Sequence, residues 1–295
     1  MPELPEVETT VRELKNKVLS RTFVDIWTDF KKMIKKPKNF QSFKKQLIGK
    51  KIHSVERRGK NILIFLSGNK VLLIHQKMTG HLLFGKWKRV RGKWLSQIAG
   101  PLFTDPDNRF LHFIVFFDNN KHLALCDQRK FAKVELWDKK ELENCTAFRN
   151  LGSEPLKKNF SFGKFKIALA KRKRGKIKQV LMDQKVIAGI GNIYSDEILW
   201  ESKVNPFQEL SNLSPSELYR VYRAMRRILK KAIKLKGTST SDFRRTSGRK
   251  GGFQDARKVY RREGEKCFRC GANIKRKKIG NRSAHFCPQC QKTTT

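Results

Sequence analysis

The stretch CFRCGANIKRKKIGNRSAHFCPQC, from Cys267 to Cys290, contains two CxxC pairs separated by sixteen residues. Each CxxC turn directs two thiolates at one point, and a gap of this length suits a β-hairpin. We therefore expect Cys267, Cys270, Cys287 and Cys290 to bind one structural Zn²⁺ ion. Four thiolates complete a tetrahedral site and leave no open position for a substrate, so no catalytic role is expected for this zinc.

Positive charge surrounds the predicted zinc site and dominates the whole chain. Lysine and arginine number 67 against 26 acidic residues, which gives a formal net charge of +41. Because a polyanion would relieve this repulsion, nucleic acid is the favoured partner, with an acidic membrane surface second. The chain has 295 residues, of which 38% are hydrophobic and 21 are phenylalanine, so it is not a disordered tail and is long enough for two domains.

Targeting and redox features point to the cell interior. No apolar run reaches the length of a membrane span, and no signal-peptide pattern precedes the charged start. We therefore expect a soluble cytoplasmic or nucleoid-associated protein. Cys126 and Cys145, which lie outside the CxxC pairs, are expected to be small, buried residues with reduced thiols.

The first half of the chain is rich in predicted strands after one predicted helix. Val7, Val11, Leu14 and Val18 recur at helical spacing. Apolar runs joined by turn residues then predict two hairpins, and several such strands favour a two-sheet antiparallel β-sandwich. The predicted hairpins join residues 62–66 to 71–74 and residues 110–117 to 122–126. Two basic stretches, residues 31–38 and 86–93, are expected to be exposed loops.

The pattern changes from strands to helices around residues 150–156, which predicts a domain boundary there. Ser214-Pro215-Ser216-Glu217 is a capping box with proline at the first helical position. The helix that begins there is expected to end near Gly237. Residues 238–252 are polar and basic without periodicity, and a loop of that length is usually functional or disordered. The chain is therefore expected to have an α+β fold.

The amino terminus carries residues suited to nucleophilic catalysis. If Met1 is removed, Pro2 presents a secondary amine beside the carboxylate of Glu3. An α-amino group titrates near ~8 and a lysine near ~10.4, so more of the terminal amine is neutral at pH 7. Attack by a secondary amine on an aldehydic carbon gives an iminium, which withdraws electrons from adjacent bonds. The alternative is that Glu3 and Glu6 only favour the start of a helix.

The glycine-containing segment Ala188-Gly189-Ile190-Gly191-Asn192-Ile193-Tyr194 lies between two predicted helices. Glycines let backbone N–H groups approach a phosphate, and a helix that begins just after them favours an anion. A tight turn between helices is the alternative interpretation. Lys171-Arg172-Lys173-Arg174 and Lys178 lie nearby in the sequence, so phosphate binding is favoured.

Two further segments each follow a predicted hairpin. They are His75-Gln76-Lys77-Met78-Thr79-Gly80 and Asp127-Gln128-Arg129-Lys130-Phe131. Met78 and Phe131 are either core residues at strand ends or apolar wedges that enter a duplex together with Arg129. An enzyme that extrudes a base must fill the space that the base leaves, and apolar wedges do this.

Together these motifs resemble the formamidopyrimidine-DNA glycosylases, bifunctional repair enzymes with a helix–two-turn–helix domain and a C-terminal zinc finger. The resemblance covers nearly the whole chain in order. Its motifs are P-E-L-P-E-V from Pro2, R-R-G-K from Arg57, H-x-x-M-T-G from His75, D-x-R-x-F from Asp127, L-G-x-E-P-L from Leu151, G-I-G-N-I-Y from Gly189 and C-P-x-C-Q from Cys287. The family commonly reads H-L-G-M-S-G, where this chain has Gln76 and Lys77.

The resemblance implies an enzyme that removes 8-oxoguanine and formamidopyrimidines from duplex DNA and then cleaves the strand by β,δ-elimination. It implies four catalytic residues: Pro2 as nucleophile, Glu3 as general acid, Lys60 as proton donor, and Arg282 at the lesion phosphates. Met78, Arg129 and Phe131 would fill the void, and residues 238–252 would cover the extruded base. The other DNA-binding residues implied are Glu6, His75, Lys173, Lys178 and Asn192.

The resemblance also suggests a domain organisation and a monomer, since a duplex would fill the cleft between domains. The expected domains are a catalytic β-sandwich at 1–150, a helix–two-turn–helix domain at 151–237, a lesion-capping loop and linker at 238–262, and a zinc finger at 263–295.

Two alternatives stay open at this stage. An endonuclease VIII-like glycosylase would share the fold and the proline but prefer oxidised pyrimidines. Those relatives usually begin P-E-G-P-E, so Leu4 and the Met78, Arg129 and Phe131 set favour the purine-specific enzyme. A non-catalytic zinc-finger clamp on DNA would explain the charge and the cysteines, but it would not need Pro2, Glu3 and Lys60.

Overall fold

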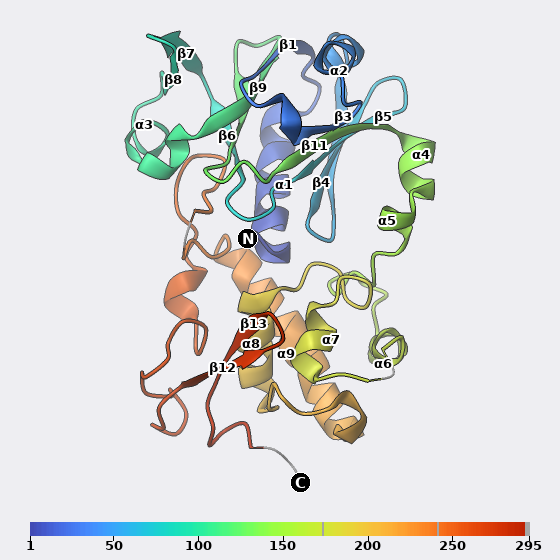
Figure 1. Cartoon of the computed structure of the whole chain (residues 1–295), viewed down its shortest axis with the longest axis vertical. Helices are drawn as coiled ribbons and strands as arrows, with labels where there is room; N and C mark the ends of the chain where they lie inside the picture. The colour runs from blue at the N-terminus through green and yellow to red at the C-terminus, as the bar shows by residue number, and fades with distance from the viewer. Residues whose placement is uncertain (173, 241, 293–295) are drawn as a thin grey trace. The chain divides into compact units, whose positions relative to one another are not determined.

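The computed structural model describes residues 1–172, 174–240 and 242–292, and its chain forms two compact units (Figure 1). The first unit comprises Met1–Arg149 and Leu235–Gln254, and the second comprises Asn150–Lys234 and Asp255–Thr295. Each unit is described by itself below. The finer division into four domains stays a prediction.

Two sheets form the framework of the first unit, as predicted. The four-stranded sheet has the order β1-β9-β10-β6, and the five-stranded sheet has the order β2-β11-β5-β4-β3. All neighbouring strands are antiparallel except β2 and β11, which are parallel. The strands are β1 (Phe23–Thr28), β2 (Ile34–Lys36), β3 (Ile52–Arg58), β4 (Asn61–Leu66), β5 (Lys70–His75), β6 (His81–Gly85), β9 (Leu111–Phe117), β10 (His122–Cys126) and β11 (Lys133–Asp138).

Both predicted hairpins are confirmed, as β4–β5 and β9–β10. Residues 31–38 and 86–93 were expected to be exposed loops, but most of both stretches is regular structure. Seven of the eight residues at 86–93 are exposed, as expected. Residues 31–36 form a 3₁₀ turn and β2, and a second small sheet pairs β7 (Trp87–Val90) with β8 (Lys93–Ser96). Arg91 and Gly92, with φ of 48° and 80°, make the two-residue turn that joins β7 to β8.

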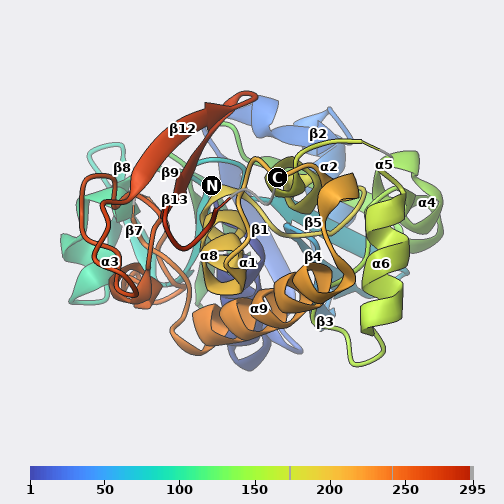
Figure 2. The ribbon, with the colours of Figure 1, turned by 90° about the horizontal axis from the view of Figure 1, so that it is seen from below.

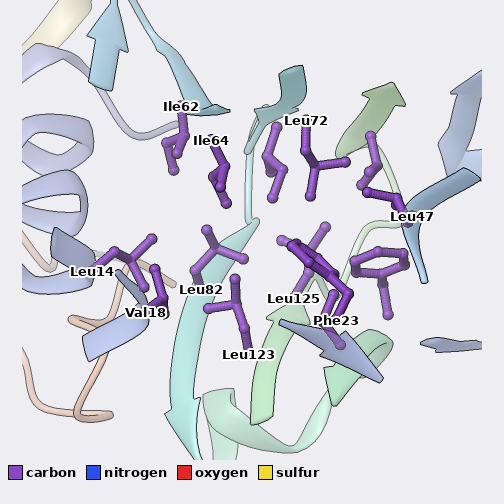
Figure 3. Packing of buried hydrophobic residues seen from close by; sticks show 14 of the residues in the cluster. Leu14, Val18, Phe23, Leu47, Ile62, Ile64, Leu72, Leu82, Leu123 and Leu125 are labelled. Carbon is purple, nitrogen blue, oxygen red and sulfur yellow. The ribbon is translucent and has the colours of Figure 1, made fainter. Parts of the chain in front are cut away.

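The main core lies between the two sheets and helix α1 (Leu4–Val18). Leu14 and Val18 of α1 are fully buried. Figure 3 shows these two side chains in one cluster with leucines and isoleucines of both sheets, among them Ile64 and Leu82. The apolar face of α1 therefore packs in the same core as the apolar residues of both sheets. This packing fixes the helix that begins the chain. Four short helices complete this unit: α2 (Phe40–Leu47), α3 (Pro101–Thr104), α4 (Lys139–Asn144) and α5 (Thr146–Arg149).

The second unit is helical, with a terminal hairpin. Helix α8 is buried along most of its length and packs against both α9 and β13 (Figure 2). The predicted capping box is present at the start of α9, where Glu217 N donates to Ser214 Oγ and Ser214 N to the Glu217 carboxylate. The elements are α6 (Phe162–Ala170), α7 (Ile177–Met182), α8 (Asn192–Ser202), α9 (Pro215–Lys234), β12 (Lys275–Ile279) and β13 (Arg282–Phe286).

Among the described residues, no helix is long and apolar enough to cross a membrane. Cys126 and Cys145 are both free thiols, although only Cys126 is fully buried.

Candidate functional site

The amino terminus of the first unit lies in a polar, largely buried setting. Pro2 is buried and Glu3 is 2% exposed. Burial lowers the pKa of the Met1 α-amino group, while the negative charges of Glu3 and Glu6 raise it and the positive charge of Lys60 lowers it. The terminus is therefore within electrostatic reach of three residues that the sequence assigned to the site.

A reciprocal capping box fixes the start of α1. The Glu3 carboxylate accepts the Glu6 N–H, and Glu3 N donates to Glu6 Oε2 at 2.8 Å. The interpretation of Glu3 and Glu6 as helix-start residues is thus correct locally. It does not compete with a chemical role, because the same contacts hold Glu3 in place beside Pro2.

Lys60 lies on the tight turn between β3 and β4 and is 7% exposed. Gly59 precedes it with φ of 58°, a conformation that favours glycine. Arg57 ties this turn to α1, since its Nε donates to Glu8 Oε2 at 2.9 Å and its Nη1 donates to Gly59 O at 2.9 Å. The turn that carries Lys60 is therefore held against the helix that carries the amino terminus.

Glu6 also binds the loop at residues 238–252. Thr238 N donates to Glu6 Oε1 at 2.7 Å. A Cβ atom at Gly237 would lie only 2.9 Å from the same oxygen, and the φ of Gly237 is 79°. A glycine is thus needed where the loop approaches α1.

The two loops that carry the proposed wedge residues lie side by side in the first unit. Thr79 Oγ1 donates to Asp127 Oδ1, and Arg129 N donates to Thr79 Oγ1 at 3.1 Å. Phe131 is 52% exposed, with the Arg129 guanidinium 4.6 Å from the centre of its ring. The core interpretation of Phe131 is therefore wrong, and Arg129 and Phe131 form one exposed unit beside half-buried Met78.

Neighbouring His75 is held neutral. Burial lowers its pKa to about 3, and the charges of Lys77 and Lys60 act in the same direction. Its Nδ1 accepts the Lys77 N–H at 3.0 Å, so the neutral ring carries its proton on Nε2. His75 is thus available as a hydrogen-bond donor at the base of the Met78 loop.

A basic groove of about 590 Å³ lies in the second unit. Asn192, the first residue of α8, and Arg282, the first residue of β13, both line it. Three more cations of the zinc hairpin, Arg276, Lys277 and Lys278, line it as well, against one carboxylate, Glu263. A helix N-terminus among clustered cations suits a phosphate, so the groove gathers two of the predicted DNA contacts.

Lys178 has a different environment from the one the sequence suggested. Its side chain is fully buried, and its Nζ donates to Asp196 Oδ1 and to Ser283 O, the latter at 3.0 Å. Asp196 Oδ2 also accepts the N–H of His285 at 3.0 Å and contacts His285 Nδ1 at 2.9 Å. Lys178 therefore joins α7 and α8 to β13, and its phosphate contact stays a prediction.

The four predicted zinc ligands lie together, with all their sulfur atoms within 4.8 Å of one another. Cys267 Sγ lies 3.9 Å from Cys290 Sγ, and Cys270 Sγ lies 3.4 Å from Cys287 Sγ. Sulfurs bound to one zinc at ~2.3 Å would be about 3.8 Å apart, so the donor set fits one structural Zn²⁺. Arg269 stacks on Trp200 at the end of α8, with 3.7 Å to the ring centre, which ties the zinc site to that helix.

One predicted site residue, Lys173, lies outside the described residues. The sequence analysis missed several buried charges that position the site. Glu197 accepts three backbone N–H groups, those of Lys258, Val259 and Tyr260, at 2.8–3.0 Å. The available signal was the pair of carboxylates, Asp196 and Glu197, among apolar residues of a helix, because a buried carboxylate needs hydrogen-bond donors.

Comparisons with known proteins agree with this arrangement. Family models match residues 1–134 (formamidopyrimidine-DNA glycosylase N-terminal domain), 151–244 (the H2TH domain of the same glycosylase) and 264–293 (zinc finger found in FPG and IleRS). A formamidopyrimidine-DNA glycosylase of Streptococcus pyogenes is 40% identical over 296 residues, 99% of both chains.

Two solved structures are similar over 99% of this chain and 100% of theirs, each at 33% identity. One is a Lactococcus lactis FPG mutant with Fapy-dG containing DNA (TM-score 0.86), and the other is MutM with carbocyclic 8-oxo-G containing DNA (TM-score 0.85). Full-length identity at this level, with the three family models matched along the chain, shows that the chain belongs to the formamidopyrimidine-DNA glycosylase family of enzymes.

Proposed function

We propose that this enzyme excises 8-oxoguanine and formamidopyrimidines from duplex DNA with Pro2 as nucleophile, and then cleaves the strand at the resulting site. The main support is the start of the chain, where Pro2 and Glu3 are buried and the Glu3 carboxylate is fixed by its capping box with Glu6. Burial also lowers the pKa of the Met1 α-amino group at this place. A neutral amine is the form that attacks carbon. When Met1 is removed, the secondary amine of Pro2 becomes the terminal amine and would be the nucleophile. Pro2 is itself buried.

The first step is displacement of the damaged base. The Pro2 nitrogen forms a bond to C1′ and the glycosidic bond breaks. The base leaves with its electron pair and takes up a proton equivalent to the one that the Pro2 nitrogen loses on bonding. Glu3 protonates the ring oxygen as the sugar opens, which leaves an iminium between Pro2 and C1′. The capping box restrains Glu3 close to that nitrogen, as this role requires.

Strand cleavage follows from the electron demand of the iminium. Loss of a C2′ proton expels the 3′ phosphate, and a second elimination expels the 5′ phosphate. We assign to Lys60 the donation of a proton during base release or β-elimination. Its position on a turn that Arg57 fixes to α1 agrees with this role. Arg282 and Asn192 would hold the phosphates in the basic groove of the second unit. Zinc supplies no chemistry and holds the hairpin that carries Arg282.

Arg129, Phe131 and Met78 would fill the space that the extruded base leaves in the duplex. Their two loops are joined through Thr79 and Asp127, so the three side chains can enter a duplex together. Arg129 would face the orphaned cytosine. We further propose that the enzyme works as a monomer in the cytoplasm, on the DNA of the nucleoid.

Borohydride trapping tests this proposal. The protein is incubated with a duplex carrying 8-oxoguanine opposite cytosine, reduced, digested and mapped by mass spectrometry. Reduction converts the iminium into a stable amine, so we expect a cross-link on Pro2 and a weaker one in Pro2→Gly, whose terminal primary amine can still form an imine. Tight binding without any cross-link, on this duplex and on one with an abasic site, would instead support the non-catalytic clamp.

A further inference from the structure

We propose that Arg244 is a positioning residue that anchors the loop at residues 238–252 for base excision, and that strand cleavage at an abasic site does not need it. The inference rests on the proposed function, because it takes this loop to cover the extruded base. It concerns the first unit alone, to which the loop and its anchoring residues all belong.

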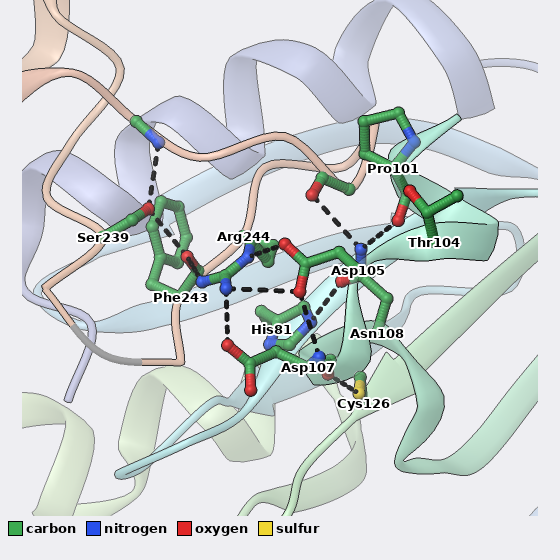
Figure 4. Close-up of polar contacts among 12 residues, drawn as sticks. His81, Pro101, Thr104, Asp105, Asp107, Asn108, Cys126, Ser239, Phe243 and Arg244 are labelled. Atoms are coloured by element: carbon green, nitrogen blue, oxygen red, sulfur yellow. Dashed lines mark hydrogen bonds and ion pairs between the residues drawn. The ribbon is translucent and has the colours of Figure 1, made fainter.

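Arg244 is inserted between two carboxylates of the segment that leads into β9. Its side chain is 4% exposed, its Nε donates to Asp105 Oδ2 at 2.6 Å, and its Nη2 donates to Asp107 Oδ2 at 2.5 Å. A second bond joins Nη2 to Asp105 Oδ1 at 3.3 Å, and Figure 4 shows the resulting fork. The planar guanidinium, unlike an ammonium, can make these bonds at once.

The carboxylates are themselves fixed. Asp105 Oδ1 accepts the Asp107 N–H at 3.0 Å, and Asp105 N donates to Pro101 O at 3.1 Å. Asn108 Nδ2 donates to Gly248 O at 3.2 Å, and Asn108 Oδ1 contacts Nε2 of His81 on β6 at 3.0 Å. Arg244 therefore binds to a part of the unit that is held to the sheet, so it can act as an anchor.

Arg244 also orients a backbone carbonyl of the loop, that of Phe243. Its Nη1 donates to Phe243 O at 3.0 Å, and Ser239 Oγ donates to the same oxygen at 2.7 Å (Figure 4). Gly251 N in turn donates to Ser239 Oγ at 2.9 Å. The guanidinium is thus connected through Phe243 to both ends of the loop.

The residues after Arg244 are held by separate contacts. Glu13 of α1 accepts from Arg245 Nε at 2.7 Å and from Thr246 N at 3.0 Å, and Phe84 N donates to Thr246 O at 2.8 Å. Loss of Arg244 should therefore not release the whole loop. It would leave the carboxylates of Asp105 and Asp107 close together without their cation, and it would displace the part of the loop that leads to Phe243.

Two substrates separate this role from general stability. A duplex with 8-oxoguanine requires the base to be covered, whereas an abasic duplex has no base to cover. In single-turnover assays with the full-length, zinc-loaded protein, we expect Arg244→Met to slow base excision by about tenfold or more, since small displacements near a reacting group can have effects of this size. Cleavage of the abasic duplex should change by less than about twofold.

The matched control is Arg249→Met, because Arg249 is an exposed arginine of the same loop and loses the same charge. It should leave unchanged the ratio of the rate of 8-oxoguanine excision to the rate of cleavage of the abasic duplex. If Arg244→Met does not fold, Asp107→Asn provides the test: its side chain is 30% exposed, and the change removes one charge from the fork. It should alter the ratio in the same direction.

Equal slowing on both substrates, or no slowing on either, would overturn the positioning role. A different result would identify failure of the proposed function itself: the unmodified protein would then neither excise 8-oxoguanine nor cleave the abasic duplex.

Discussion

Replacement of Asp196 by asparagine should destabilise the second unit by about 3–5 kcal/mol, the usual effect of removing one partner from a buried ion pair. Neither Asp196 nor Lys178 has an exposed side chain. Asparagine has nearly the same shape and can still accept one bond, but it leaves the Lys178 ammonium buried without its counter-charge. The two His285 contacts of Asp196 are weakened as well.

A matched variant in the same unit sets the scale. Asp183 pairs with Arg172 at 3.2 Å, but their side chains are 21% and 47% exposed. An exposed pair contributes up to about 1 kcal/mol, so Asp183→Asn should have a small effect. Both variants replace one carboxylate of an ion pair by an amide, so the difference between them reports the burial of the Asp196 pair together with its His285 contacts.

Hydrogen exchange followed by mass spectrometry is the suitable assay, because it resolves single elements. A loss of 3–5 kcal/mol should speed exchange in α8 and β13 by about 100-fold or more, with the strands of the first unit unchanged. Exchange no faster in Asp196→Asn than in Asp183→Asn would refute the reasoning. Adding Lys178→Met to Asp196→Asn should recover part of the loss, since the buried ammonium without its counter-charge is then removed.

Three more predictions concern other parts of the chain. Gln76→Leu should stabilise the protein by about 1–3 kcal/mol in urea unfolding, because both polar atoms of this buried amide have no partner among the described residues. Burial, with Lys86 and Lys121, lowers the pKa of His122 to about 4, so stability present above pH 6.5 should fall as His122 of the unfolded chain protonates. His122→Gln should reduce that loss between pH 6.5 and 5 by about 2 kcal/mol, measured from urea midpoints. Cys287→Ser should lose zinc by metal analysis and weaken DNA binding in a titration; full affinity without zinc would contradict the role of the hairpin.

Features set by neighbouring residues could be predicted from the sequence. The zinc ligands, the β4–β5 hairpin and the Ser214 capping box each depend on fewer than thirty consecutive residues, and the structure has all three. The basic stretch at residues 86–93 was predicted wrongly for a related reason. Its charges suggested a loop, but Trp87 is buried and Trp94 packs edge-on against Trp27, so aromatic packing outweighs the charge.

Contacts between distant residues could not be predicted in this way. Arg244 and Asp105 are 139 residues apart, and nothing in either local sequence indicates the other. Lys178 shows the same limit, because its basic surroundings in the sequence suggested a phosphate contact and its burial depends on Asp196 and Ser283. The environment of a charged residue can therefore be predicted from the local sequence only when its partner lies in the same element.

The two oxygens of Glu6 connect the proposed chemistry with the proposed recognition of the base. Oε2 accepts the N–H of Glu3, which belongs to the amino-terminal site, and Oε1 accepts the N–H of Thr238, where the loop begins. A glutamine at this position has only one acceptor oxygen, so its amide group would face one of these two N–H donors. Glu6→Gln should therefore displace either the amino-terminal site or the start of the loop. The helix itself should stay intact, because it does not depend on the charge of Glu6. The position of the proposed nucleophile and the position of the loop thus both involve one carboxylate, so we expect only an acidic side chain at this position to hold both.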